Sequence, residues 1–156
     1  EPGTVGAVLT DARIMTEVIA DGHHVHPAGV KLLIRAKGVD RVILITDAVA
    51  AAGMPNGEYM LGELPIVMTD GVARLRDGDS LAGSTLTMID AFRFAVREAG
   101  VTVAEASRMA SGNPARQLGV DGVCGSLAAG KRADVLLLDD SLSLRRVWIG
   151  GRELAD

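Results

Sequence analysis

Apolar residues in the first fifty positions occur in short runs with two different spacings, which predicts alternating strands and helices. Residues 16–20 (TEVIA) form a short β-prone run, and residues 41–46 (RVILIT) form a continuous apolar run typical of a strand buried on both faces. Between them, residues 27–37 follow helical spacing, with Pro27 suited to the first turn and Gly38 to the stop. A strand–helix–strand unit of this kind implies parallel strands.

Residues 53–83 have a different sequence pattern, because glycines and Asn-Gly or Asp-Gly pairs interrupt short apolar segments. Two such segments are residues 65–68 and 72–75, and both are short enough for strands. Turn residues at this density favour hairpins and loops over helices. We therefore expect a small antiparallel insertion here.

Two helices are expected next, followed by a return to β structure. Ser84 is a candidate N-cap for a helix that ends at Gly100. Thr102 and Glu105 have the spacing of a capping box, and residues 112–114 (GNP) are expected to stop that second helix.

After Gly119 the apolar runs at 135–138 and 146–149 read as strands, with Gly150-Gly151 as a tight turn. We place a domain boundary near residue 120, which gives units of 1–120 and 121–156.

The number of barrel-type strands limits what the segment can form alone. A closed (β/α)8 barrel needs eight strand–helix repeats and typically about 250 residues. Only two strands of that type are expected here, and two strands cannot close. The first residues, Glu1-Pro2-Gly3, carry no methionine. We expect the segment to be the later part of a longer chain.

Composition narrows the classes of partner and compartment. The 156 residues carry 16 Lys and Arg against 20 Asp and Glu, a net charge of −4 without a basic cluster. This balance argues against nucleic acid or an anionic membrane surface as a partner. No apolar run reaches the length of a membrane span, and no signal-peptide pattern is present. The single Cys124 fits a reducing compartment, and we expect a cytoplasmic protein.

The candidate chemistry lies where the first two strands end. His23, His24 and His26 follow the first strand, and Asp47 follows the second. Groups at the carboxyl ends of parallel strands meet on the ligand face, so a histidine and Asp47 are expected to be neighbours. Two alternatives stay open: Asp47 as a cap with the histidines as surface polar residues, or a metal pair at His24 and His26.

A second candidate feature is the segment 81–85 (LAGST), directly before the first long helix. Backbone N–H groups at a helix start can hold an anion or a polar ligand. An ordinary N-cap explains the same residues.

Taken in order, these segments resemble the N-acetylglucosamine-6-phosphate deacetylase family of the amidohydrolase superfamily. The similarity covers essentially the whole chain and rests on these blocks: 19–27 (IADGHHVHP), 44–48 (LITDA), 80–84 (SLAGS), 113–115 (NPA) and 125–134 (GSLAAGKRAD). The last block resembles many amidohydrolases, whereas the Ala-Asp-Gly-x-His-Val, Thr-Asp-Ala and Leu-Ala-Gly-Ser blocks discriminate more strongly.

The resemblance implies a fold and a set of roles. The expected class is α/β: the C-terminal part of a (β/α)8 TIM-type metal-dependent hydrolase barrel, followed by part of a small β-sandwich domain. Asp47 matches the catalytic aspartate, His24 matches a histidine that contacts the sugar phosphate, and Leu81, Ala82 and Gly83 match a substrate-contacting loop. His23 is assigned no role.

The resemblance also implies components outside this chain. A divalent metal ion (Zn, Fe, Mn or similar) is expected to be bound mainly by upstream residues, with no metal ligand in this segment beyond a contact of Asp47 to metal-bound water. The expected partners are a sugar phosphate, the missing N-terminal part of the same protein and a second copy in a homodimer.

The implied reaction is hydrolysis of the N-acetyl group of N-acetylglucosamine 6-phosphate to glucosamine 6-phosphate and acetate. Asp47 would take a proton from the water and deliver it to the departing nitrogen. The alternatives are another amidohydrolase, dihydroorotase-like or deaminase-like, and a non-catalytic fragment. The segment alone is expected to be inactive.

Overall fold

A parallel pair of strands and the helix that connects them form the centre of the computed structural model, which describes residues 1 and 3–154. Strand β1 (Thr16–Ile19) pairs with β2 (Val42–Ile45) in register from Thr16 opposite Val42 to Ile19 opposite Ile45. Helix α2 (Pro27–Lys37) and the short turn η1 (Val39–Arg41) connect them. Gly38 follows α2 with φ 74°, as expected for a residue that ends a helix. The predicted strand–helix–strand unit is confirmed.

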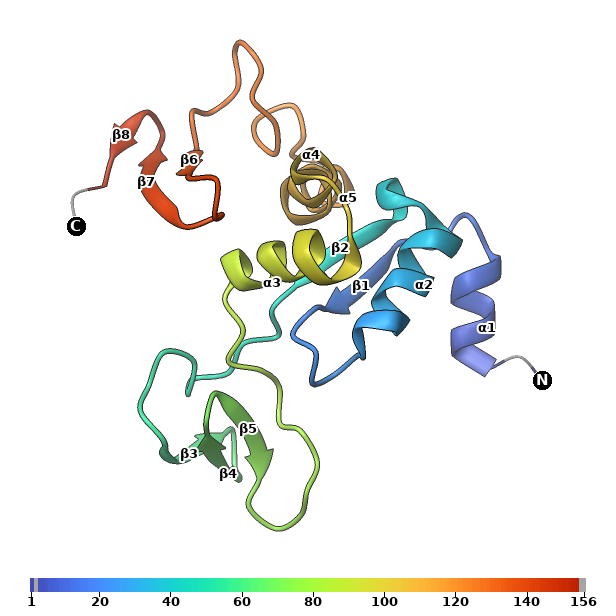
Figure 1. The fold of residues 1–156 in the computed structure, drawn as a ribbon, viewed down its shortest axis with the longest axis vertical. Helices are drawn as coiled ribbons and strands as arrows, with labels where there is room; N and C mark the ends of the chain where they lie inside the picture. Colours follow the sequence, from blue (N-terminus) through green and yellow to red (C-terminus); the bar gives the residue numbers. More distant parts are fainter. Residues whose placement is uncertain (2, 155–156) are drawn as a thin grey trace.

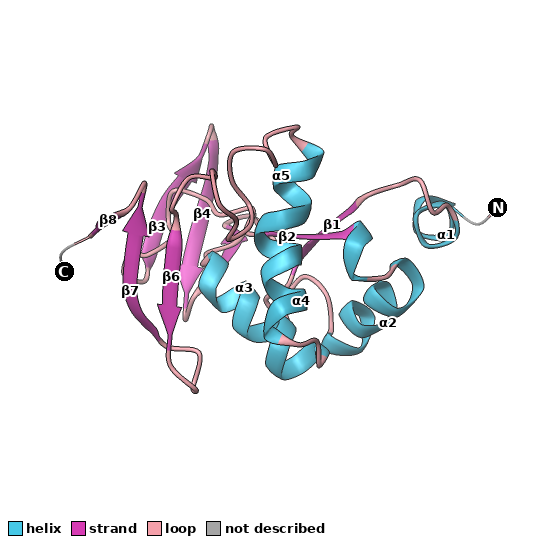
Figure 2. Ribbon diagram, turned by 90° about the horizontal axis from the view of Figure 1, so that it is seen from above, coloured by secondary structure: helices cyan, strands magenta, loops and turns pink. Residues whose placement is uncertain are grey.

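One face of this strand pair is covered by helices, as Figure 2 shows. Helix α3 (Met88–Phe94) continues into a wider π-type turn, η2 (Ala95–Ala99), which Gly100 ends with φ 79°. Helix α4 (Val103–Ser107), the π-type turn η3 (Arg108–Gly112) and α5 (Asn113–Gln117) follow. The main core joins the sheet to these helices, and its buried members include Val18, Val30, Leu44, Phe92 and Met109.

Two details of the predicted helices are wrong. The N-cap of α3 is Thr87, whose side chain accepts the Asp90 N–H, and not Ser84. The second helix is not stopped at residues 112–114 but continues as α5. Pro114 is tolerated because it lies at the start of α5, where a missing N–H is least disruptive, and because η3 has already widened the helical turn. The capping box of Thr102 and Glu105 is present as predicted.

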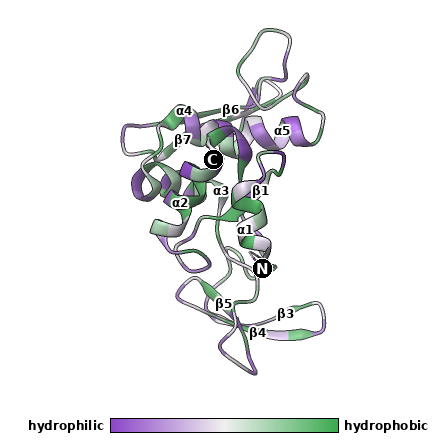
Figure 3. Ribbon diagram, turned by 90° about the vertical axis from the view of Figure 1, so that its right-hand side faces the viewer, coloured by the Kyte–Doolittle hydropathy of each residue, from purple (hydrophilic) through white to green (hydrophobic). Residues whose placement is uncertain are grey.

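Two small antiparallel sheets lie beside the helical layer, and in Figure 1 one lies below it and the other to its upper left. The first contains β3 (Gly57–Leu61), β4 (Leu64–Thr69) and β5 (Val72–Leu75), and has its own core around Ile66, Met68 and Ala73. The second contains β6 (Val135–Leu138), β7 (Leu144–Ile149) and β8 (Arg152–Glu153). Figure 3 shows the first sheet projecting from one end of the molecule, and the polar surface of α5 near the other end.

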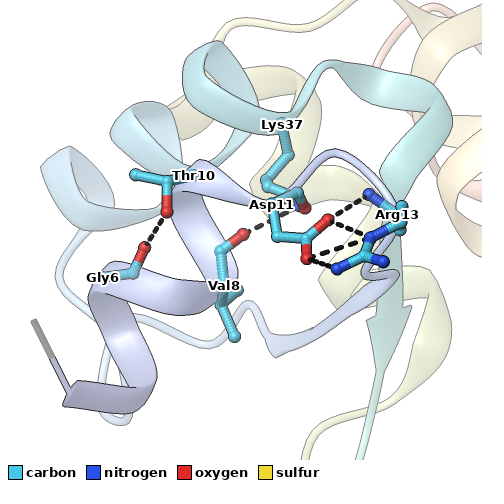
Figure 4. Close-up of polar contacts among 6 residues, drawn as sticks. All are labelled: Gly6, Val8, Thr10, Asp11, Arg13 and Lys37. Atoms are coloured by element: carbon cyan, nitrogen blue, oxygen red, sulfur yellow. Dashed lines mark hydrogen bonds and ion pairs between the residues drawn. The ribbon is translucent and has the colours of Figure 1, made fainter.

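A short helix at the beginning of the described chain was not predicted. Helix α1 (Gly3–Thr10) has no buried residue. A helix that does not pack on a core needs no apolar stripe, and the sequence of α1 shows no clear one from which the helix could be predicted. It is held by the ammonium group of Lys37 at the end of α2, which donates to the carbonyls of Val8 (2.8 Å) and Asp11 (2.6 Å). Figure 4 shows this contact beside the ion pair between Asp11 and Arg13. The α1–α2 contact therefore depends on carbonyl capping more than on apolar burial.

A buried amide ties the helical layer to the beginning of β2. The side-chain nitrogen of Asn113 donates to the carbonyl oxygens of Val39 and Val42, each at 2.7 Å, and the residue is completely buried. These bonds satisfy two carbonyls at the point where η1 passes into β2. The position of β2 is thus fixed from the helix side as well as by β1.

Among the described residues, no helix has both the length and the apolar character that crossing a bilayer requires.

Candidate functional site

The carboxyl ends of β1 and β2 lie at the same edge of the sheet, because the two strands are parallel and in register. The loop that begins at Asp21 and contains the three histidines leaves β1 at this edge, and Asp47 leaves β2 there. The structure therefore places the predicted histidine cluster and the predicted aspartate after adjacent strand ends. This is the geometry in which α/β proteins assemble ligand sites.

Asp47 occupies an unusual backbone conformation with a free carboxylate. Its φ is 50°, in the left-handed region that only a few per cent of non-glycine residues adopt, with aspartate among the more tolerant. The residue is exposed, and within residues 1 and 3–154 its carboxylate forms no hydrogen bond or ion pair. The structure thus gives no support to the alternative in which Asp47 caps the following segment.

Asp47 also lines an open cavity of about 340 Å³ along β2. The wall includes Ile43 and Ile45 from β2, Glu17 from β1 and Met88 from α3. Asp47 therefore lies at the edge of an open, largely apolar space that begins where β2 ends.

The loop of residues 81–84 packs directly against Asp47. The Ser84 N–H donates to the Asp47 carbonyl at 2.8 Å, and the Ser84 carbonyl accepts the Val49 N–H at 2.9 Å. The buried Ser84 hydroxyl donates to the Thr46 carbonyl and accepts the Leu86 N–H at 3.0 Å, so Ser84 joins the loop to the end of β2 and does not cap a helix.

Gly83 makes the closest approach of this loop to the strand end. Its φ is +62°, and a Cβ there would lie 2.5 Å from Val49 Cγ1 and 2.9 Å from the Asp47 carbonyl oxygen. Only glycine combines this conformation with this spacing. Of the predicted substrate-contacting residues, Gly83 is therefore in contact with Asp47, while Ala82 is buried and Leu81 is partly exposed.

The three histidines have different environments. His23 is exposed, whereas His24 is about four-fifths buried and its Nδ1 lies 2.7 Å from Asp21 Oδ2. The Nδ1 of His26 accepts the Ala28 N–H at 3.2 Å, which makes His26 the N-cap of α2. His24 and His26 are thus engaged by separate partners within the chain.

Asp21 is a site residue that the sequence analysis did not single out. Burial raises the pKa of its carboxyl, but hydrogen bonds from the His24 N–H, the His24 ring and the His23 N–H outweigh burial and lower that pKa below its ordinary value. The Asp-x-x-His spacing in a loop after a strand is the signal that could have indicated this pair.

Within the described part of the chain, no group of three or more His, Cys, Asp or Glu side chains is arranged to hold a metal ion. Asp47 is the carboxylate that the candidate site offers toward the cavity, together with Glu17 on its wall.

Comparison with known proteins relates the chain to deacetylases of amino-sugar phosphates. A putative N-acetylgalactosamine-6-phosphate deacetylase of Escherichia coli (strain K12) is 54% identical over 152 residues, which cover 97% of this chain and 90% of that protein. The N-acetylglucosamine-6-phosphate deacetylase of Vibrio furnissii is 42% identical over 156 residues, which cover 100% of this chain and 39% of that protein.

A solved structure agrees with the sequence relatives. A mutant of the N-acetyl-D-glucosamine-6-phosphate deacetylase from Mycobacterium smegmatis, in complex with N-acetyl-D-glucosamine-6-phosphate, superimposes with a TM-score of 0.93 at 43% identity. The match covers 98% of this chain and 41% of that one. The chain thus spans about two fifths of two of these relatives and nine tenths of the third.

The model of the amidohydrolase family matches residues 5–154, nearly the whole sequence. Together with the similarity to deacetylases across both sequence and structure, this match establishes an α/β hydrolase fold. The chain belongs to the amidohydrolase family.

Proposed function

We propose that this chain is the part of an N-acetylglucosamine-6-phosphate deacetylase that supplies the acid–base carboxylate and part of the sugar-phosphate site. The observation that carries the proposal is Asp47: an unpaired carboxylate at a strand end, in a left-handed conformation, with the 81–84 loop bonded to its backbone. Backbone conformations of this kind persist where the surrounding structure fixes them, and they cluster at active sites.

The chemistry follows from what one carboxylate can do in sequence. The Asp47 carboxylate accepts a proton from the water that attacks the acetyl carbonyl carbon. It then returns that proton to the amide nitrogen as the carbon–nitrogen bond breaks, because an amine is too basic to leave as an anion. The products are the free amino sugar phosphate and acetate. His24 and residues 81–83 (LAG) bind the sugar phosphate in this proposal.

The same proposal includes the larger architecture. Residues 1–120 form the C-terminal part of a (β/α)8 barrel, and residues 121–156 form the C-terminal part of a small β domain. A divalent metal ion would be bound mainly by residues upstream of this segment, with Asp47 in contact with metal-bound water. The whole enzyme is a cytoplasmic homodimer. The family match and the deacetylase relatives support the metal-dependent hydrolase class on which this proposal rests.

The test uses the longest natural chain that carries these residues, assayed for acetate release from N-acetylglucosamine 6-phosphate. Asp47→Asn should lower kcat by about 10²–10⁴-fold with little change in KM. Asp70→Asn is the matched control, because Asp70 has the same φ of 50° and lies in the β4–β5 turn. Near-normal turnover in Asp47→Asn would refute the acid–base role. No hydrolysis by the unmodified chain would favour the non-catalytic alternative.

The configuration at C4 of the sugar is a second question that the same assay answers. The relative at 54% identity is named for the galactosamine epimer and the one at 42% for the glucosamine epimer. We therefore include N-acetylgalactosamine 6-phosphate as a second substrate. A kcat/KM ratio far in its favour would move the assignment to that epimer and leave the role of Asp47 unchanged.

A further inference from the structure

The carboxylate of Asp21 makes three contacts that together shape the loop after β1. Its Oδ1 accepts the N–H groups of His23 at 2.8 Å and of His24 at 2.9 Å, and its Oδ2 lies 2.7 Å from the His24 ring nitrogen Nδ1. The Asp21 side chain is 9% exposed and that of His24 is 19% exposed. One oxygen thus closes the turn, and the other holds the imidazole.

An ionised carboxylate can only accept hydrogen bonds, which determines where the ring proton of His24 resides. Since Oδ2 has no proton to donate, the short contact requires a hydrogen on Nδ1. The Nε2 of neutral His24 is then an acceptor, and it forms no hydrogen bond within residues 1 and 3–154. An acceptor nitrogen in this position is complementary to a hydroxyl group.

His26, two residues further on, has the opposite arrangement. Its Nδ1 accepts a backbone N–H from Ala28, so the hydrogen of the neutral ring must be on Nε2. The two rings lie in one loop and differ in the partner of Nδ1. His26, which has no hydrogen bond to the Asp21 carboxylate, therefore serves as a control for the effect of Asp21 on His24.

We propose that Asp21 is a positioning residue that fixes His24 in the Nδ1–H tautomer, so that Nε2 accepts a hydrogen bond from a hydroxyl of the sugar phosphate. The part of this inference that concerns the substrate rests on the proposed function. The part that concerns the tautomer rests only on the contacts of Asp21. The two parts can be tested separately.

The tautomer is read from the ¹⁵N chemical shifts of the imidazole nitrogens in the longest natural chain at a pH where the rings are neutral. A protonated and an unprotonated ring nitrogen resonate far apart, and His24→Asn identifies the His24 signals by their loss. We expect His24 with hydrogen on Nδ1 and His26 with hydrogen on Nε2. His24 with its hydrogen on Nε2 would overturn the proposal.

Asp21→Asn is the decisive variant, because it keeps an acceptor for the two backbone N–H groups and replaces the other oxygen by a donor. A donor facing Nδ1 forces the hydrogen of His24 onto Nε2. We therefore expect the two His24 signals to exchange their character while the His26 signals stay unchanged. Unchanged His24 signals would show that Asp21 does not set the tautomer. Altered His26 signals would show that the loop itself has been disrupted, and Asp21 would then be structural.

Kinetics with N-acetylglucosamine 6-phosphate test the second part. Asp21→Asn converts Nε2 from an acceptor into a donor, so a hydroxyl that donates to Nε2 must turn and lose its aligned bond, and KM should rise by up to about tenfold while kcat changes by less than about threefold. A loss of kcat alone would contradict a role in binding through His24. If the unmodified chain does not hydrolyse the substrate, the proposed function fails, and the ¹⁵N result still decides the role of Asp21.

Discussion

Replacing Gly83 by alanine tests whether the 81–84 loop is fixed against Asp47. The left-handed backbone at φ +62° costs an L-residue about 1–2 kcal/mol. The added methyl group would also lie 2.5 Å from Val49 Cγ1 and 2.9 Å from the Asp47 carbonyl oxygen. Overpacking of this kind adds about 1–3 kcal/mol. Gly83→Ala should therefore lower the free energy of unfolding by about 2–5 kcal/mol.

A matched control separates the two contributions. Gly62, in the turn between β3 and β4, has φ +60°, and a Cβ there would meet no heavy atom within 4 Å. Gly62→Ala should therefore lose only the conformational part, about 1–2 kcal/mol. For a chain of this size, each kcal/mol corresponds to about 2–4 °C in Tm, so thermal unfolding followed by circular dichroism resolves the difference.

The origin of the extra destabilisation can be assigned with Val49. Val49→Ala removes the methyl group in the 2.5 Å contact, so part of the Gly83→Ala effect should disappear in the double variant. Equal losses of stability in Gly83→Ala and Gly62→Ala would refute the reasoning, because the loop would then have room beside Asp47. The same result would remove one support for the proposed site.

Three further predictions concern contacts outside the candidate site. Asn113→Ala should lower the free energy of unfolding in urea by about 2–4 kcal/mol, because the buried carbonyl of Val42 and the partly buried carbonyl of Val39 lose their donor, and a loss below about 1 kcal/mol would contradict this. Lys37→Met should speed hydrogen exchange throughout α1 and change global stability by less than about 1 kcal/mol, whereas unchanged exchange would show that other contacts hold α1. Hydrogen bonds from the Ser141 hydroxyl and the Ser143 N–H lower the pKa of Asp139 from 3.8 to about 2, so its stabilising contribution is complete above the unfolded pKa and disappears as pH falls through the folded pKa. Asp139→Asn should remove this part of the acid dependence, measured as urea midpoints from about pH 5 to pH 2, and an unaltered profile would argue against it.

The central strands and α2 could be predicted because their local signals agree with their tertiary role. Residues 42–45 are apolar and three of the four are buried, and Gly38 ends α2 where the helical spacing stops. The capping box at Thr102 has the same character, since both of its hydrogen bonds are local. A segment can be predicted from sequence when its local conformational preference agrees with its packing in the fold.

The parts that could not be predicted depend on contacts distant in sequence. Ser84 resembles an N-cap, but its hydroxyl donates to the carbonyl of Thr46, 38 positions away. Helix α1 depends on Lys37, 26 to 29 positions away. Within the site, the spacing predicted that Asp47 and the histidine loop leave the same sheet edge, but not the left-handed conformation of Asp47 or the pairing of Asp21 with His24.

The amide of Asn113 has a mechanical consequence for the strand that it anchors. Strand β2 has one sheet neighbour in the described chain, β1, and the Asn113 amide adds a second hold at Val39 and at Val42, the first residue of the strand. Asp47 lies only two residues beyond Ile45, the last residue of this short strand. Helix α5 therefore holds the beginning of the strand that carries Asp47 just beyond its other end.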